Sequence, residues 1–249
     1  MSYIEIENVS KSYNRDKKIF ETFSLKIHKG KFISFIGSYG SGKTTLLKMI
    51  AGVESIDGGK ILIDNCLPEN LKNKRKIGFA FQEPKLLPWK SVIDNIALPT
   101  EIHDKKDIEK AKKLLKLVDL EEKADKYPRE LSGGMQRIVS ILRAMILEPA
   151  VLLMDEPLSS IDEINRDELH EKLISIHKAN KQTTILVTHS IHEAVYLSDE
   201  IYVLGGSPTK VIKTIIPKKP RKVNSKFSSD TMRQVAEIRE ELRKAVNYE

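Results

Sequence analysis

The chain has 249 residues and a formal net charge of +7, with 40% hydrophobic and 31% charged residues. This length suits one large α/β domain with a smaller lobe, and no apolar run approaches the roughly 18 residues of a membrane span. The single cysteine, Cys66, excludes an internal disulfide and a cysteine-based zinc site, so we interpret it as a packing residue. The opening residues show no secretory signal, and we therefore expect a cytoplasmic protein.

The positive charge is compatible with nucleic acid, anionic lipid or phosphorylated small molecules as partners. The basic residues are dispersed through mixed-sign segments such as DKKDIEKAKKLLK, a pattern typical of a solvated helix face. Aromatic residues make up only 6% of the chain and are not interleaved with arginines, unlike those of most nucleic-acid-binding surfaces. We therefore expect no nucleic-acid partner.

Strand-like and helical patterns alternate along the chain. The first third contains the strand-like runs YIEIENV, IFETFSLKI, KFISFIG and KILID. Apolar residues then recur at helical spacing from Asp104 to Lys116, and a second helix is predicted from Ser132 towards Leu147. The later runs AVLLMDE, TTILVTHS and EIYVL are typical of buried parallel strands. This order predicts an α/β fold with a helical lobe in the middle, bounded by the prolines near Pro84 to Pro99 and by Pro149.

The last part of the chain begins with a basic, proline-rich segment from Ile216 to Lys226, which we expect to be extended. This segment is compatible either with nearby anionic lipid or with a solvated linker. A closing helix is predicted after it, and we expect that helix to pack on its own domain. Its apolar stripe consists of Met232, Val235, Ile238, Leu242 and Val246.

The segment GSYGSGKT follows a strand-like run and precedes a helical one. In this pattern the glycines Gly37 and Gly42 let backbone N–H groups close around phosphate oxygens, while Lys43 meets the β- and γ-phosphate charge. The hydroxyl of Thr44 is suited to bind Mg²⁺. A helix that begins near Lys43 adds its dipole, so the segment predicts a nucleoside triphosphate site.

Polar residues stand at the ends of several apolar runs: Gln82 follows IGFAF, Asp155 and Glu156 end VLLMDE, and His189 ends TTILVTH. In an open parallel sheet such groups meet beyond the carboxyl ends of the strands, so we expect them to share one crevice with the phosphate loop. Their chemistry suits Asp155 to hold hydrated Mg²⁺ and Glu156 to polarise a water. Gln82 is suited to sense metal and water, and His189 to hydrogen-bond the γ-phosphate.

The stretch LSGGMQR predicts a second anion-binding helix terminus. Ser132 can cap the helix, and Gly133 and Gly134 let its first N–H groups approach a ligand. Alone, this stretch is also compatible with an ordinary turn. Together with the phosphate loop, the Asp-Glu pair, Gln82 and His189 in this order, it resembles the ATP-binding subunit of an ATP-binding cassette (ABC) transporter, from about Tyr3 to Thr214.

The resemblance implies that two copies associate head to tail, each ATP lying between one phosphate loop and the partner's signature stretch. It implies ATP and Mg²⁺ as cofactors and assigns roles residue by residue. Catalytic roles fall on Glu156, His189 and Gln82. The ATP-binding residues are Tyr13, which stacks on adenine, and Gly37, Ser38, Tyr39, Gly40, Ser41, Gly42, Lys43, Thr44 and Thr45. Metal binding falls on Thr44, Gln82 and Asp155, and contact with the partner's ATP on Leu131, Ser132, Gly133, Gly134 and Gln136. Asp162 would link the two sites across the interface.

The resemblance also implies a P-loop NTPase core with a mostly parallel sheet, an N-terminal antiparallel β subdomain and a helical signature-motif lobe. The ABC ATPase domain would span residues 1–216, with the lobe at about 84–147, and residues 217–249 would form the basic linker and C-terminal helix. Expected partners are a second copy or a paired ABC subunit, membrane permease subunits and, indirectly, a solute-binding protein, at the cytoplasmic face of the membrane. The chain departs from the family's commoner residues at Ser38, Tyr39, Ser160 and Ser190, none of which removes a group with an assigned role.

The segment FQEPKLLPWKSVIDNIALP is similar to that of importer ATPases for nitrate, alkanesulfonates, taurine, bicarbonate and pyrimidine precursors of thiamine. Its apolar residues Leu86, Leu87 and Trp89 either line a groove for a permease helix or pack within the helical lobe. Two other classes of ATPase are alternatives to a transport subunit. A DNA-repair or chromosome ATPase of the same superfamily usually carries a long coiled-coil or zinc insertion, and a ribosome-acting factor needs two cassettes in tandem. This chain has an ordinary lobe and one cassette, which favours transport.

Overall fold

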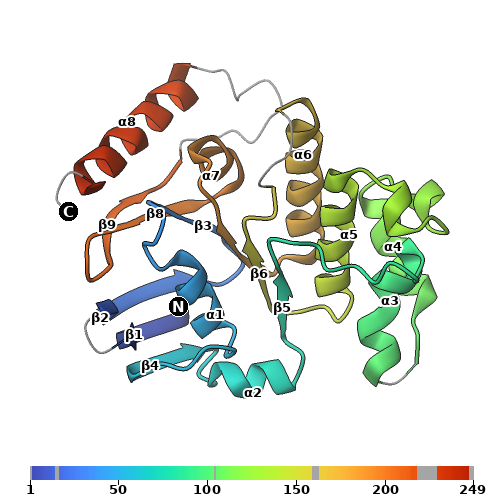
Figure 1. Ribbon diagram of the computed structural model, residues 1–249, viewed down its shortest axis with the longest axis horizontal. Helices are drawn as coiled ribbons and strands as arrows, with labels where there is room; N and C mark the ends of the chain where they lie inside the picture. Colours follow the sequence, from blue (N-terminus) through green and yellow to red (C-terminus); the bar gives the residue numbers. More distant parts are fainter. Residues whose placement is uncertain (1, 15–16, 104, 159–162, 218–228, 247–249) are drawn as a thin grey trace. The chain divides into compact units, whose positions relative to one another are not determined.

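A computed structural model describes residues 2–14, 17–103, 105–158, 163–217 and 229–246 (Figure 1). The chain divides into two compact units. We call Met1–Lys74 with Thr183–Glu249 the terminal unit and Arg75–Gln182 the middle unit. Each is described by itself.

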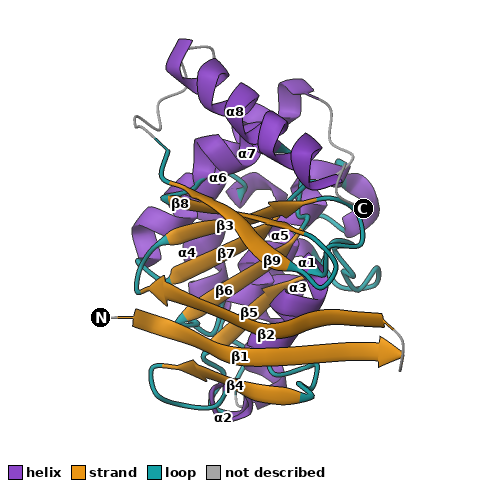
Figure 2. Ribbon diagram, turned by 90° about the vertical axis from the view of Figure 1, so that its left-hand side faces the viewer, coloured by secondary structure: helices purple, strands orange, loops and turns teal. Residues whose placement is uncertain are grey.

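An antiparallel sheet forms the first part of the terminal unit. It contains β1 (Ser2–Asn14), β2 (Lys17–His28) and β4 (Gly58–Ile63) in the order β2-β1-β4, and Figure 2 shows these strands side by side. Alternate residues of β1 turn to the core, where Ile4 and Ile6 are at most 1% exposed. This period of two is the pattern of a sheet with one buried face, and the predicted antiparallel β subdomain is confirmed.

A second sheet of the terminal unit is largely parallel. β3 (Phe32–Gly37) pairs in parallel with both β7 (Thr183–Val187) and β8 (Glu200–Gly205), and β9 (Lys210–Ile215) pairs antiparallel with β8. Every residue of β3 and β7 is buried. Strands that are apolar on both faces need cover on both faces. Helices α1 (Lys43–Ile50) and α7 (Ile191–Leu197) pack against this sheet, while α2 (Pro68–Asn73) packs against β4.

The closing helix α8 (Ser229–Val246) packs on α7, β8 and β9 of the terminal unit, as expected of a helix that packs on its own domain (Figure 1). Val235 and Ile238 are buried and Leu242 is half-buried against them. The predicted stripe is wrong at Met232, which is 45% exposed because it lies in the first turn, ahead of the buried cluster. The side chain of Val246 lies outside the described residues, as does most of the basic segment from Ile216 to Lys226.

The middle unit combines two parallel strands with the helical lobe. Its strands are β5 (Ile77–Ala80) and β6 (Val151–Asp155). Its helices are α3 (Val92–His103), α4 (Ile108–Leu117), η1 (Glu121–Lys123), η2 (Pro128–Glu130), α5 (Gly133–Met145) and α6 (Glu163–Asn180). Helix α5 contacts both strands and the helices α3, α4 and α6. It is therefore the central element of this unit.

Two sequence-based expectations for the lobe are corrected. The helix predicted from Asp104 begins at Ile108, because the side chain of Asp107 caps it by accepting the Lys110 N–H at 2.9 Å. Pro99 was expected to bound the lobe but lies inside α3. Within that turn the Thr100 hydroxyl donates to the Ala97 carbonyl at 2.6 Å. Along the described residues, none of the helices combines the length and apolarity needed to cross a bilayer.

Candidate active site

The phosphate loop of the terminal unit connects β3 to α1. The Lys43 ammonium donates to the carbonyls of Gly37 at 3.0 Å and Ser38 at 2.8 Å, and to the Ser41 hydroxyl at 3.3 Å. Lys43 is only 5% exposed, so the loop holds a buried cation next to polar backbone groups. Burying a cation is costly unless negative charge compensates it, which suits this position to phosphate oxygens.

The helix that follows this loop starts without a side-chain cap. Gly42 is the N-cap residue with a φ of 73°, and as a glycine it supplies no side-chain cap hydrogen bond. A Cβ at Gly42 would lie 2.6 Å from Ile19 Cγ2 and 2.9 Å from the Phe20 ring, so both the conformation and the space require glycine. A glycine-capped helix start of this kind is typical of a phosphate-binding loop, so the segment fits a triphosphate group.

Two further predicted residues lie in the terminal unit. Tyr13, on β1, is 55% exposed, and its hydroxyl oxygen lies 3.4 Å from Thr45 Oγ1 in the first turn of α1. His189, just beyond β7, is exposed, and its ring lies 6.4 Å from the Tyr39 ring at an interplanar angle of 21°. Tyr13, which is predicted to stack on the adenine base, and His189, which is predicted to hydrogen-bond the γ-phosphate, therefore both lie near the phosphate loop.

The backbone around His189 is held by a network that the sequence did not reveal. The Thr188 hydroxyl donates to Glu193 Oε2 at 2.5 Å and accepts the Ser190 N–H at 3.0 Å. The Ser190 hydroxyl accepts the Glu193 N–H at 3.2 Å and caps α7. Ser190 stands where an aspartate often follows the histidine, and it still supplies a cap.

In the middle unit, the structure brings together Gln82 and Glu156. Gln82 Nε2 lies 3.4 Å from Glu156 Oε2, and both residues come just after the ends of adjacent parallel strands, β5 and β6. Glu156 has a φ of 45°, which a non-glycine residue adopts at a cost and which occurs often at functional sites. Asp155, the last residue of β6, is 8% exposed. These are oxygen-bearing side chains of the type that Mg²⁺ prefers.

The stretch from Leu131 to Gly134, called the signature turn below, stands at the start of α5, as predicted. Ser132 is the N-cap residue, and its hydroxyl accepts the Met135 N–H at 3.3 Å. A Cβ at Gly133 would meet nothing within 4 Å, so the start of this helix is open to an approaching ligand. The Gln136 amide donates to the carbonyls of Pro128 at 3.0 Å and Leu131 at 3.3 Å. Gln136 thus ties the turn to the segment before it.

Two arginines on α5, which sequence reasoning missed, hold the neighbouring loops. Arg137 donates to the Pro157 carbonyl at 3.0 Å, directly after Glu156. Arg143 donates to the carbonyls of Pro84 at 2.7 Å and Lys85 at 2.9 Å, in the loop that follows Gln82. No motif in the sequence points to these contacts, since positions six residues apart lie on different faces of a helix. Asp162, predicted to link the two sites, lies outside the described residues.

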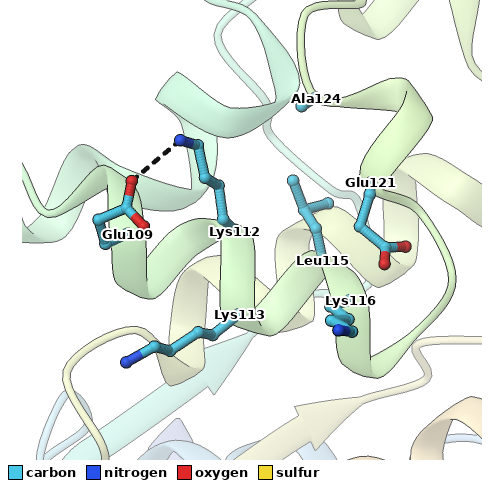
Figure 3. A pocket seen from close by; sticks show the side chains of 7 residues that line it. All are labelled: Glu109, Lys112, Lys113, Leu115, Lys116, Glu121 and Ala124. Atoms are coloured by element: carbon cyan, nitrogen blue, oxygen red, sulfur yellow. Dashed lines mark hydrogen bonds and ion pairs between the residues drawn. The ribbon is translucent and has the colours of Figure 1, made fainter.

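A hollow of about 380 Å³ beside α4 contains none of the predicted site residues (Figure 3). It is lined by Glu109, Lys112, Lys113, Leu115, Lys116, Glu121 and Ala124. The Lys112 ammonium donates to Glu109 at 2.9 Å, and the three lysines are exposed. This mixed-charge surface agrees with the predicted solvated helix face.

Comparison with known proteins identifies the family. The family model described as "ABC transporter" matches residues 20–159. An aliphatic sulfonates import ATP-binding protein from Bacillus cereus is 38% identical over 93% of this chain and 94% of its own. A choline transport ATP-binding protein from Bacillus subtilis is 42% identical over 84% of this chain and 59% of its own. A solved dimeric ATP-binding cassette, bound to ADP and Pi in a post-hydrolysis state, has a TM-score of 0.74 at 28% identity and covers 87% of this chain and 100% of its own.

The chain belongs to the ABC transporter family. It is an ATP-binding subunit with ATPase activity, and it uses ATP with Mg²⁺. The predicted P-loop NTPase fold and the resemblance to sulfonate-type importer ATPases are confirmed. The three proteins named here are cassettes or transport proteins, so they give no support to the alternative of an ATPase acting on nucleic acid or ribosomes.

Proposed function

We propose that two copies of this chain form a dimer on binding MgATP and drive the import of a small solute through a membrane permease. The observation that carries the proposal is the phosphate loop, where Lys43 is buried against the carbonyls of Gly37 and Ser38 at the glycine-capped start of α1. Family membership supplies the link to transport, and the dimeric cassette supports the pairing of two copies.

In the terminal unit, the loop from Gly37 to Thr45 holds the phosphates of ATP. Lys43 neutralises the β- and γ-phosphates, and Thr44 offers its hydroxyl to Mg²⁺. Tyr13 supports the adenine ring by stacking, and His189 donates a hydrogen bond to the γ-phosphate. When bound, Mg²⁺ offsets the charge that develops on the phosphates during transfer to water.

In the middle unit, Glu156 accepts the proton of the attacking water, and Gln82 orients that water through its amide. The 3.4 Å contact between their side chains supports a shared task. Asp155 would help to hold the hydrated Mg²⁺. The signature turn from Leu131 to Gly134 meets the partner's ATP: the Ser132 hydroxyl accepts a backbone N–H as cap, and its own proton is free to be donated to a phosphate.

The permease docks, in this proposal, on the segment between β5 and α3. Asn95 pins this segment, since its side chain accepts the Leu87 N–H at 2.8 Å and donates to the Leu87 carbonyl at 3.1 Å. The pinned turn leaves Trp89 70% exposed, which suits an aromatic anchor at an interface. The chain would act at the cytoplasmic face of the membrane, held there by the permease.

For the solute, we propose a small organic anion of the sulfonate type as the first class to test. Relatives named for sulfonate import and for choline transport have similar identities to this chain, 38% and 42%, so this subunit alone discriminates weakly between solutes. Identification of the permease and solute-binding protein that co-purify with the tagged chain from membranes, followed by solute-binding assays, tests this class.

Glu156→Gln tests the catalytic assignment. Glutamine keeps the shape but cannot accept a proton, so ATP binding is retained, hydrolysis falls on the order of a hundredfold or more, and a stable dimer accumulates with MgATP. ATP turnover and size-exclusion chromatography with and without MgATP measure these effects. Glu109→Gln, at an exposed position on α4, is the matched control and leaves both unchanged (Figure 3). Turnover by the Glu156 variant at the wild-type rate would overturn the base assignment.

Trp89→Ala tests the docking segment. Removal of the exposed indole weakens co-purification of the permease but leaves ATP hydrolysis by the isolated subunit unchanged. Ile102→Ala on α3 is the control, because Ile102 is also exposed, at 67%. Equal permease recovery with both variants would place the docking surface elsewhere.

A further inference from the structure

A buried lysine lies against the ring of Tyr13, the residue that is predicted to stack on adenine. Lys11, on β1, is 5% exposed, although a buried lysine is costly unless its charge is compensated. Its ammonium makes an ion pair with Glu54 at 2.6 Å and lies 3.9 Å from Asp57. Lys11 is therefore fixed by the loop that follows α1.

That ammonium also lies over the ring of Tyr13, 5.2 Å from the ring centroid. The attraction between a cation and the face of an aromatic ring favours this geometry. Since Lys11 occupies one face and Tyr13 is 55% exposed, a stacking base takes the face away from Lys11. A cation on the first face also draws electron density from the ring, which lessens the repulsion between the ring and a stacked base.

The loop after α1 ties this arrangement to the phosphate loop. The backbone N–H groups of Val53 and Glu54 bond the Lys48 carbonyl near the end of α1, at 3.1 and 3.3 Å. At the start of the same helix, Thr45 Oγ1 lies 3.4 Å from the Tyr13 hydroxyl. Tyr13 and the residues around it are thus attached to α1 near both of its ends.

The charges of the pair reinforce each other. A hydrogen bond with Glu54 raises the pKa of Lys11 despite its burial. Hydrogen bonds from Lys11 and Tyr13 lower the pKa of Glu54, so both groups stay charged near neutral pH. Asp57 adds a further constraint, because its carboxylate accepts the Ser12 N–H at 2.7 Å, between Lys11 and Tyr13.

We propose that Lys11 and Glu54 are positioning residues that set the plane of the Tyr13 ring and so determine the affinity for the base of the nucleotide. The inference rests on the proposed role of Tyr13 in stacking on adenine. It adds two residues to which the sequence analysis assigned no role, and their effect is on the affinity for the base and not on the affinity for the phosphates.

The test compares the affinities of two probes by competition with a fluorescent nucleotide: ATP, and inorganic triphosphate, which lacks a base. Lys11→Met should weaken ATP binding about fivefold and leave triphosphate binding unchanged, because only the base contacts the Tyr13 ring. Lys11→Arg, which keeps a cation, should restore most of the affinity. Glu54→Gln should give the same base-dependent loss, though smaller, and Lys60→Met, at an exposed ion pair on β4, is the matched control.

Tyr13→Leu separates failure of this inference from failure of the proposed function. A base-dependent loss of about tenfold in Tyr13→Leu with no loss in Lys11→Met would overturn the inference and keep the stacking role. An unchanged affinity in Tyr13→Leu would overturn both. Equal losses for ATP and triphosphate in Lys11→Met would show a merely structural role and overturn the inference as well.

Discussion

The two helix starts that are predicted to bind anions, α1 in the terminal unit and α5 in the middle unit, are built differently. Helix α1 begins at Gly42 in a left-handed conformation and has no side-chain cap. Helix α5 begins after Ser132, whose hydroxyl caps it at 3.3 Å from the Met135 nitrogen. One start has a glycine cap with no side-chain acceptor, whereas the other pairs one of its N–H groups with a capping hydroxyl.

This difference fits two separate functions, primary ATP binding at α1 and contact with the partner's ATP at α5. A glycine-capped helix start beside a buried cation gains most from a bound nucleotide, because the negative charge of the phosphates is attracted by both the helix dipole and the cation. A capped start is stable by itself, and its exposed glycine permits a second molecule to approach and leave. The structure thus favours primary ATP binding at α1 and a transient contact at α5, as expected if the signature turn serves a neighbouring copy.

Lys43→Met has the largest expected effect on this comparison. Loss of the ammonium removes the only charged side chain within the loop from Gly37 to Thr45, so ATP affinity falls on the order of a hundredfold and turnover is lost. Isothermal titration with ATP measures the affinity. Retained affinity would show that Lys43 does not contact the phosphates.

Ser132→Ala has a smaller effect on binding but a large one on turnover. The isolated subunit keeps its ATP affinity, since α1 is untouched, while hydrolysis falls about a hundredfold from loss of one phosphate donor. The lost cap lowers the free energy of unfolding by about 1 kcal/mol, which urea denaturation measures. A loss of primary ATP affinity would contradict the claim that α1 binds ATP without help from the signature turn of the same copy.

Gly42→Ala sharpens the structural side of the comparison. A Cβ would meet Ile19 and Phe20 in a residue already held at a φ of 73°, so the free energy of unfolding falls by about 2 kcal/mol. Gly133→Ala, with open space at the first residue of α5, changes the free energy of unfolding by no more than about 0.5 kcal/mol. Equal costs at the two positions would refute the contrast.

The pair of Lys11 and Glu54 gives the smallest expected effect, through its pH dependence. The folded pKa of Glu54 is lowered from 4.5, so its stabilising contribution is present above that pH and is lost as pH falls through the folded pKa. The melting temperatures of wild type and Glu54→Gln therefore differ at pH 6 and converge in acid. A constant difference down to pH 3, which is about one and a half units below the ordinary value, would contradict the assignment.

The sequence predicted those features that depend on local patterns. Apolar runs located the strands around Ile33, Leu153 and Leu186, and the glycine spacing located the phosphate loop and the Ser132 turn. The start of α4 was misplaced because Asp107 caps it, and α3 was missed because Pro99 suggests a boundary. The contacts of Arg143 and Lys11 could not be predicted, since each joins segments whose proximity only the fold creates.

The most direct test of the central claim, that each ATP is held by one copy's phosphate loop and another copy's signature turn, mixes two inactive variants. Lys43→Met lacks a working loop, and Ser132→Ala lacks a working turn. In a mixed dimer one site combines both defects and the other has none, so an equal mixture should regain roughly a quarter of wild-type ATP turnover if the sites act independently. No recovery in a mixture shown to form mixed dimers would mean that each copy completes its own site, and would contradict the account.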